Sequence, residues 1–163
     1  GEFAQAHEWN HEAQLDWEAL ADPAHGGVKN LVQDLNGLYK RTRALYASDD
    51  SPEGFEWLIG DDSGNSVFAF LRHCSNESLL VICNMTPVPR QGYRVGVPCG
   101  GIWAEKLNTD SSSYGGSNMG NASAVATERV FAHGKPQSLS LTLPPLSTLI
   151  LSCEGAGHVC EPA

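Results

Sequence analysis

The sequence predicts a mainly β protein, an antiparallel β-sandwich that follows one amphipathic helix. Apolar residues near position 30 recur at helical spacing, whereas from Phe55 onward the period changes to two and β-branched and aromatic residues become frequent. Turn signals rich in Gly, Pro, Asn and Asp separate the stretches of period two. Many short strands divided by such turns are typical of a β-sandwich.

The helix is expected between two groups of helix-breaking residues. Gly26-Gly27 is expected to precede it, and the polar run 48–52, which ends in Pro52, is expected to follow it. One apolar stripe on one helix cannot form a core, so the helix must pack on another element or expose the stripe. The stripe consists of Val28, Leu31, Val32, Leu35, Leu38 and Tyr39.

Strands are expected through most of the remaining chain. Residues 79–83 are apolar on both faces and are expected at the centre of a sheet, whereas residues 137–143 alternate Leu with Ser and Thr. Residues 108–125 are rich in Gly, Ser and Asn, and we expect a long loop there. The expected strands are residues 55–59, 66–72, 79–85, 93–97, 103–107, 128–132, 137–143 and 146–152.

Charge and cysteine content exclude several classes of function. A formal net charge of -9 with scattered Lys and Arg argues against a nucleic-acid or anionic-membrane partner, and no apolar stretch is long enough to span a bilayer. The five cysteines are irregularly spaced without a C-x-x-C pair, which favours a reducing, cytoplasmic setting. The glycine-rich run 115–120 lacks the Lys and the following helix of a phosphate loop, so no cofactor is expected.

One short motif points to a metal enzyme. His7-Glu8-Trp9-Asn10-His11 fits H-E-x-x-H, in which a helix places two imidazoles on one face for Zn²⁺ and the Glu acts as general base. The pattern fixes only three positions and can arise by chance. A zinc protease also needs a third ligand and a sheet before the motif. We therefore assign no metal ligand and keep a zinc hydrolase as the weaker alternative.

Tryptophan beside carboxylates and amides indicates sugar binding. Trp9 and Trp17 lie in a polar stretch with Asp16, and Trp103 begins a predicted strand after two glycines. Indole rings stack on the C–H faces of pyranose sugars while polar groups bind the hydroxyls. Burial in the core is the competing interpretation for each of these rings. For Trp57 the sequence leaves core and surface equally open.

Runs of residues along nearly the whole chain resemble bacterial glycogen (1,4-α-glucan) branching enzymes of the α-amylase family. The similarity keeps its order up to about residue 152. It begins with Gly1-Glu2-Phe3-Ala4-Gln5, Glu8-Trp9-Asn10, Leu15-Asp16-Trp17 and the helix pattern of residues 27–39. It continues through residues 52–57, Asn84-Met85-Thr86-Pro87-Val88-Pro89-Arg90, Leu107-Asn108-Thr109-Asp110, Tyr114-Gly115-Gly116-Ser117 and residues 138–146.

The resemblance implies how the chain is organised. Branching enzymes join a (β/α)8 catalytic barrel to a β-sandwich, so residues 1–50 would be the last strand-loop-helix remnant of the barrel. Residues 51–153 would be the sandwich, and residues 154–163 a tail. The family cleaves an α-1,4 linkage and transfers the chain to a 6-hydroxyl with retention, using carboxylates on earlier barrel strands. None of those carboxylates is in this sequence, so no catalytic residue is assigned.

The resemblance also implies partners and binding residues. The expected partners are α-glucans such as glycogen, amylose and amylopectin, and the N-terminal barrel of the same protein. Trp9, Asp16 and Trp17 would belong to the acceptor side of the barrel cleft, with Leu15 as a further binding residue. If the sandwich helps to hold glucan, Trp103 is the first candidate, because the two glycines before it give little cover. A stand-alone carbohydrate-binding β-domain is the alternative function.

Overall fold

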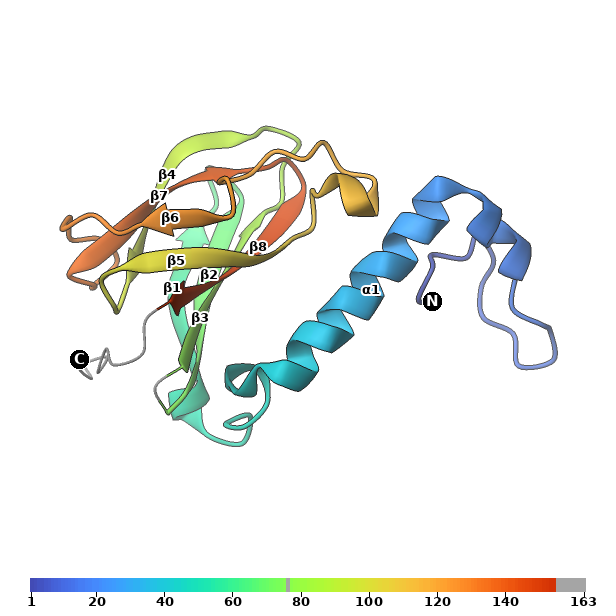
Figure 1. Ribbon diagram of the computed structural model, residues 1–163, viewed down its shortest axis with the longest axis horizontal. Helices are drawn as coiled ribbons and strands as arrows, with labels where there is room; N and C mark the ends of the chain where they lie inside the picture. The colour runs from blue at the N-terminus through green and yellow to red at the C-terminus, as the bar shows by residue number, and fades with distance from the viewer. Residues whose placement is uncertain (76, 155–163) are drawn as a thin grey trace.

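Two antiparallel sheets face each other in the computed structural model, which describes residues 1–75 and 77–154 (Figure 1). The larger sheet has six strands in the order β1-β2-β3-β8-β5-β6, and the smaller pairs β4 with β7. The predicted mainly β sandwich is confirmed. The strands are β1 (Phe55–Asp62), β2 (Val67–Cys74), β3 (Glu77–Asn84), β4 (Arg90–Val97), β5 (Ile102–Asn108), β6 (Ala124–Ala126), β7 (Gln137–Leu143) and β8 (Ser147–Glu154).

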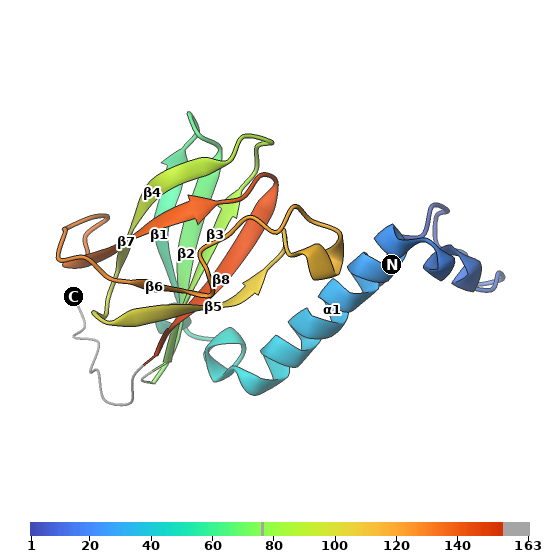
Figure 2. The same cartoon turned by 45° about the horizontal axis from the view of Figure 1, so that its top comes forward.

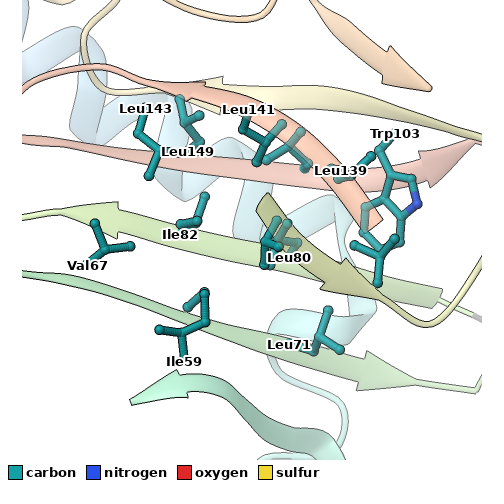
Figure 3. Packing of buried hydrophobic residues seen from close by; sticks show 14 of the residues in the cluster. Ile59, Val67, Leu71, Leu80, Ile82, Trp103, Leu139, Leu141, Leu143 and Leu149 are labelled. Carbon is teal, nitrogen blue, oxygen red and sulfur yellow. The ribbon is translucent and has the colours of Figure 1, made fainter. Parts of the chain in front are cut away.

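The main core fills the space between the two sheets. Strands β2, β3, β7 and β8 each contribute alternate residues to it, as the two-residue period of a strand requires. Figure 3 shows the labelled side chains of both sheets pointing into this layer. The residues of the cluster are Ile59, Val67, Ala69, Leu71, Leu80, Ile82, Val95, Val97, Cys99, Trp103, Leu139, Leu141, Leu143, Leu149 and Leu151.

A helix covers the opposite face of the large sheet. Helix α1 (Pro23–Arg41) and the short 3-10 turn η2 (Arg43–Leu45) pack there, over side chains from β2, β3, β5 and β8. Of the two outcomes expected for the helix, the structure has the packed one rather than an isolated helix. This second cluster consists of Leu38, Ala44, Cys74, Leu79, Val81, Cys83, Leu107 and Ile150.

Helix α1 begins earlier than the sequence pattern predicts. Asp22 is its N-cap, its carboxylate accepts the Ala24 N–H at 2.8 Å, and Pro23 occupies the first helical position. Gly26-Gly27 therefore lies inside the helix, and the expectation that it precedes the helix is wrong. The cap and the proline outweigh the cost of two interior glycines.

The expectation of a strand at residues 128–132 is also wrong. Glu128 and Ala132 make only single bridges, to Ser138 and Lys135. A tight turn at His133 and Gly134, with φ of 49° and 74°, bends the chain back before a ladder can form. A short strand lies instead in the expected loop 108–125, where β6 pairs with β5. Its small residues give no periodic signal, so only the pairing reveals it.

Other boundaries agree with the sequence or remain predictions. Residues 63–66 form the turn between β1 and β2, and β3 lies between β2 and β8 as a central strand should. Of the predicted tail, residues 155–163 lie outside the described residues, while Glu154 ends β8. The domain boundary at residue 50 stays a prediction. Among the described residues, no helix is long and apolar enough to cross a membrane.

The packing of α1 predicts unequal effects for two leucines of one helix. Leu38 is 3% exposed and Leu35 is 38% exposed. We expect Leu38→Ala to lower the free energy of unfolding by about 2–5 kcal/mol. The matched change Leu35→Ala should cost about 0.5 kcal/mol. Urea unfolding measures both, and equal losses would contradict the packing of α1 on the sheet.

Candidate functional site

A pocket at the amino-terminal end of the chain brings together three of the five predicted binding residues. Trp9, Leu15 and Asp16 line a hollow of about 260 Å³. Its other lining residues are Gln5, His7, Glu8, Asn10, Ala13 and Gln14. Figures 1 and 2 show this segment at the far end of α1, away from both sheets.

Local hydrogen bonds close the loop around the pocket. The Asp16 N–H donates to the Gln5 side-chain oxygen at 2.7 Å, which joins the two ends of the loop. Within the loop, the Asn10 side chain accepts the Glu12 N–H at 3.0 Å. Asx turns of this kind let an irregular segment satisfy its backbone groups without regular secondary structure. The pocket is therefore built from residues close together in the sequence.

Trp17 follows the lining residue Asp16 in the chain and packs on Phe3. It opens the 3-10 turn η1 (Trp17–Ala21), and its ring stacks on the buried Phe3 ring with centroids 5.5 Å apart. The Phe3 carbonyl oxygen lies 2.8 Å from Nδ1 of His25, in the first turns of α1. Trp17 is not among the lining residues of the pocket, although part of its surface is exposed. Its predicted binding role stays a prediction.

The pocket combines an indole ring with carboxylate and amide side chains. Trp9 is 72% exposed, with the His11 ring tilted against it at a centroid distance of 6.0 Å, so most of its surface is open to a ligand. The carboxylates of Glu8 and Asp16 and the amides of Gln5 and Asn10 surround it. Such groups bind sugar hydroxyls, while an indole packs on the apolar face of a pyranose. The pocket is smaller than the roughly 300–1,000 Å³ of typical ligand sites, so it suits a short stretch of sugar.

The same segment removes the basis for a zinc site. His7-Glu8-Trp9-Asn10-His11 lies in a loop, not on the helix that the H-E-x-x-H geometry requires. In the described part of the chain, no three His, Cys, Asp or Glu side chains are grouped so that they could hold a metal ion. The zinc-hydrolase interpretation therefore has no geometric support.

Trp103 is a core residue, and the expectation that it offers an exposed ring to glucan is wrong. Its side chain is 0% exposed and packs among the apolar side chains between the sheets (Figure 3). The indole N–H donates to the Cys99 carbonyl oxygen at 3.1 Å, which satisfies its one polar group. The two preceding glycines gave no indication that the strand turns this residue inward.

Sequence reasoning missed an aromatic patch on the outer face of the large sheet. Phe55 and Trp57 of β1 lie beside Phe68 and Phe70 of β2, with the Phe55 and Phe70 rings stacked at 5.1 Å and the Trp57 and Phe70 rings edge to face at 5.7 Å. Trp57 is 58% exposed, which settles its place on the surface. Aromatic residues two apart in adjacent strands share a face, and that spacing could have identified the patch.

Comparison with known proteins agrees with this architecture. Residues 57–154 match the family described as alpha amylase, C-terminal all-beta domain. The chain belongs to this family. The matched segment contains the sandwich, from within β1 to the last described residue of β8.

Curated relatives extend the similarity to the amino-terminal segment. The 1,4-alpha-glucan branching enzyme GlgB of Cupriavidus necator is 56% identical over 162 residues, which are 98% of this chain and 21% of that protein. GlgB of Pseudomonas fluorescens is 57% identical over 151 residues, 92% of this chain and 20% of that protein. The chain thus spans about a fifth of the length of the curated relatives it matches.

Solved structures share the fold at lower identity. A cyclomaltodextrin glucanotransferase, CldA, has a TM-score of 0.51 at 18% identity, covering 82% of this chain and 22% of that one. A trehalulose synthase, MutB, has a TM-score of 0.51 at 22% identity, covering 82% of this chain and 19% of that one. At these identities the likeness concerns the fold alone.

The burial of the tryptophans predicts opposite results for two substitutions. Trp103→Ala should lower the free energy of unfolding by about 3–5 kcal/mol, because it leaves a cavity between the sheets. Trp57→Ala removes one exposed ring of a surface patch and should cost about 1 kcal/mol. Chemical denaturation measures both. A denaturation curve for Trp103→Ala equal to that of the parent chain would contradict the core position of this ring.

Proposed function

We propose that this chain is the carboxyl-terminal part of a 1,4-α-glucan branching enzyme, where it binds α-glucan and packs against the catalytic barrel. The identity to GlgB proteins over nearly the whole chain is the observation that carries the proposal. The pocket around Trp9 and the aromatic patch at Trp57 support a role in holding sugar. The family of the sandwich is compatible with this assignment.

In the proposed parent reaction, one carboxylate attacks the anomeric carbon of an α-1,4 linkage and a second carboxyl group protonates the departing chain. A glucan 6-hydroxyl then takes the place of water: it gives its proton to this second group, attacks the anomeric carbon, displaces the first carboxylate and forms the α-1,6 branch. Retaining transfer of this kind needs two carboxyl groups about 5–5.5 Å apart. On the resemblance to branching enzymes, these groups belong to barrel strands outside this sequence. This chain's own residues would bind and orient glucan.

Two surfaces are the proposed glucan contacts. The pocket would hold sugar through Trp9, Leu15 and Asp16, with Trp17 beside it. The exposed rings of Phe55 and Trp57 offer a second, flatter surface on the sandwich. An exposed ring contributes on the order of 1 kcal/mol to sugar binding. A long glucan that touches both surfaces gains affinity by multivalency.

The remainder of the barrel is the proposed partner of the free side of α1. Leu35 and Tyr39 are exposed on the helix, and the Tyr39 ring contacts the exposed Tyr46 ring with centroids 5.4 Å apart. Contiguous apolar surface of this kind indicates a contact site in a larger protein. Packing of barrel strands against it would place the Trp9 pocket beside the catalytic cleft.

The absence of the catalytic carboxylates leads to a prediction about activity. The purified 163-residue chain should form no α-1,6 branches on amylose and release no reducing sugar, because it has no nucleophile for the first step. Debranching followed by chain-length analysis measures branches, and a reducing-end assay measures hydrolysis. Branch formation by chain free of contaminating enzyme would show that the reaction groups lie within this sequence.

The proposed glucan surfaces can be tested on immobilised amylopectin. We expect Trp9→Ala and Trp57→Ala each to weaken retention about fivefold, the effect of losing on the order of 1 kcal/mol. Phe131→Ala is the matched control, because Phe131 is 73% exposed and belongs to neither surface. Equal retention of all three variants and the parent would refute glucan binding at both surfaces.

A further inference from the structure

A loop of the sandwich contacts helix α1 near the amino-terminal end of the helix. The loop between β5 and β6 carries the 3-10 turn η4 (Ser112–Tyr114), which lies against the helix in both views (Figures 1 and 2). A Cβ added at Gly27 would lie 2.5 Å from the Tyr114 carbonyl oxygen and 2.7 Å from its carbonyl carbon. Real side chains do not approach backbone this closely, so only glycine allows the contact.

A hydrogen bond fastens the same loop two helical turns further along. The Tyr114 hydroxyl donates to the Asp34 carboxylate at 2.7 Å. Residues 27 and 34 share one face of the helix, since seven residues make two turns. Burial of the phenol and its bond to Asp34 raise the pKa of Tyr114 to about 12, so the hydroxyl keeps its proton at neutral pH. Tyr114 therefore contacts α1 at two points, once through its backbone and once through its side chain.

Hydrogen bonds from two side chains hold this loop in one conformation. The Asp110 carboxylate accepts the Ser117 N–H at 3.0 Å, the Ser117 hydroxyl at 2.6 Å and the Met119 N–H at 3.0 Å. The Asn108 side chain accepts the Asp110 N–H and donates to the Met119 carbonyl oxygen. Burial alone would raise the pKa of Asp110, but the bonds from Ser117 and Met119 hold it below its ordinary value. A carboxylate bonded in this way fixes the turn around it.

The other side of the same helical turns carries the pocket. His25 of α1 is bonded to the Phe3 carbonyl oxygen, and the Phe3 ring stacks on Trp17. Asp16, next in the chain to Trp17, is bonded to Gln5 and lines the pocket. Gly27, where the loop contacts the helix, lies only two positions after His25. A continuous series of contacts thus joins the sandwich loop to the pocket.

We propose that Gly27 and Tyr114 are positioning residues for the Trp9 pocket, so that the sandwich sets the geometry of this glucan site through α1. Neither residue lines the pocket. They act by fixing the first turns of α1, to which residues 3–17 are attached. The inference rests on the proposed glucan binding for its ligand, whereas the coupling itself is a property of this chain.

The test is a titration with maltoheptaose, read by NMR at the tryptophan indole N–H signals. The Trp9 signal reports the pocket and the Trp57 signal reports the sheet patch in the same sample. We expect Gly27→Ala to raise the dissociation constant read at Trp9 by about two- to thirtyfold, the range for residues coupled to a site they do not touch. The constant read at Trp57 should not change, which a general loss of stability would not produce.

Gly26→Ala is the matched control. It changes the neighbouring residue of the same helix, and a Cβ at Gly26 meets nothing within 4 Å. Both constants should equal those of the parent chain. Tyr114→Phe is a second variant that keeps the ring and removes the hydrogen bond to Asp34. It should raise the dissociation constant read at Trp9 about twofold. It decides the matter if Gly27→Ala does not fold.

The outcomes separate the two proposals. If maltoheptaose does not shift the Trp9 signal of the parent chain, glucan binding at the pocket fails. The coupling is then tested by the ligand-free spectra, in which Gly27→Ala and Tyr114→Phe should shift the Trp9 and Trp17 signals while Gly26→Ala leaves them in place. Unchanged ligand-free signals in the folded variants, or binding at Trp9 equal to that of the parent, overturn the positioning role of Gly27 and Tyr114.

Discussion

Burial of β3 on both faces is the constraint on which the rest of the structure depends. Leu80 and Ile82 point into the layer between the sheets, and Leu79, Val81 and Cys83 point to the other side. Each exposed apolar side chain of this size would cost about 1.5–3 kcal/mol, so both faces need a cover. Strands β4 and β7 cover one face, and α1 with η2 covers the other. The helix and the sandwich therefore share a core.

As a result, α1 packs on the sheet at one end and extends beyond it at the other. Its carboxyl-terminal half is held by the sheet through Leu38, and its 19 residues span about 28 Å. The amino-terminal loop with the pocket lies at the other end (Figure 1). A helix held at only one end could change its orientation relative to the sheet. The loop at η4 contacts the helix at Gly27 near its amino-terminal end, and the Tyr114 hydroxyl donates to Asp34 two turns further along. The sandwich thus contacts the helix that carries the Trp9 pocket, although no residue of the sandwich lines the pocket.

The candidate site was predictable where its residues are close in sequence. Trp9 and Asp16 were singled out as tryptophan and carboxylate in one polar stretch, and the resemblance added Leu15; a short loop brings the three together. Trp103 and Trp57 were harder, because a strand has two faces and neighbouring residues do not say which face a second sheet covers. Trp103 lies under β7 and is buried, whereas Trp57 lies on an edge strand that α1 leaves partly open. Burial at these two positions depends on contacts with distant parts of the chain.

The sequence by itself determined the mainly β class, the amphipathic helix and every longer strand of the described residues, whereas it missed the three-residue β6. Periodicity and turn residues act within a few positions, so they can be read along the chain. Tertiary structure decided what lies far apart in sequence and meets in space. It placed Gly27 inside the helix against Tyr114, paired β6 with β5, and directed the ring of Trp103 into the core. The physical reason is that burial and close approach depend on the partner surface, which no local pattern contains.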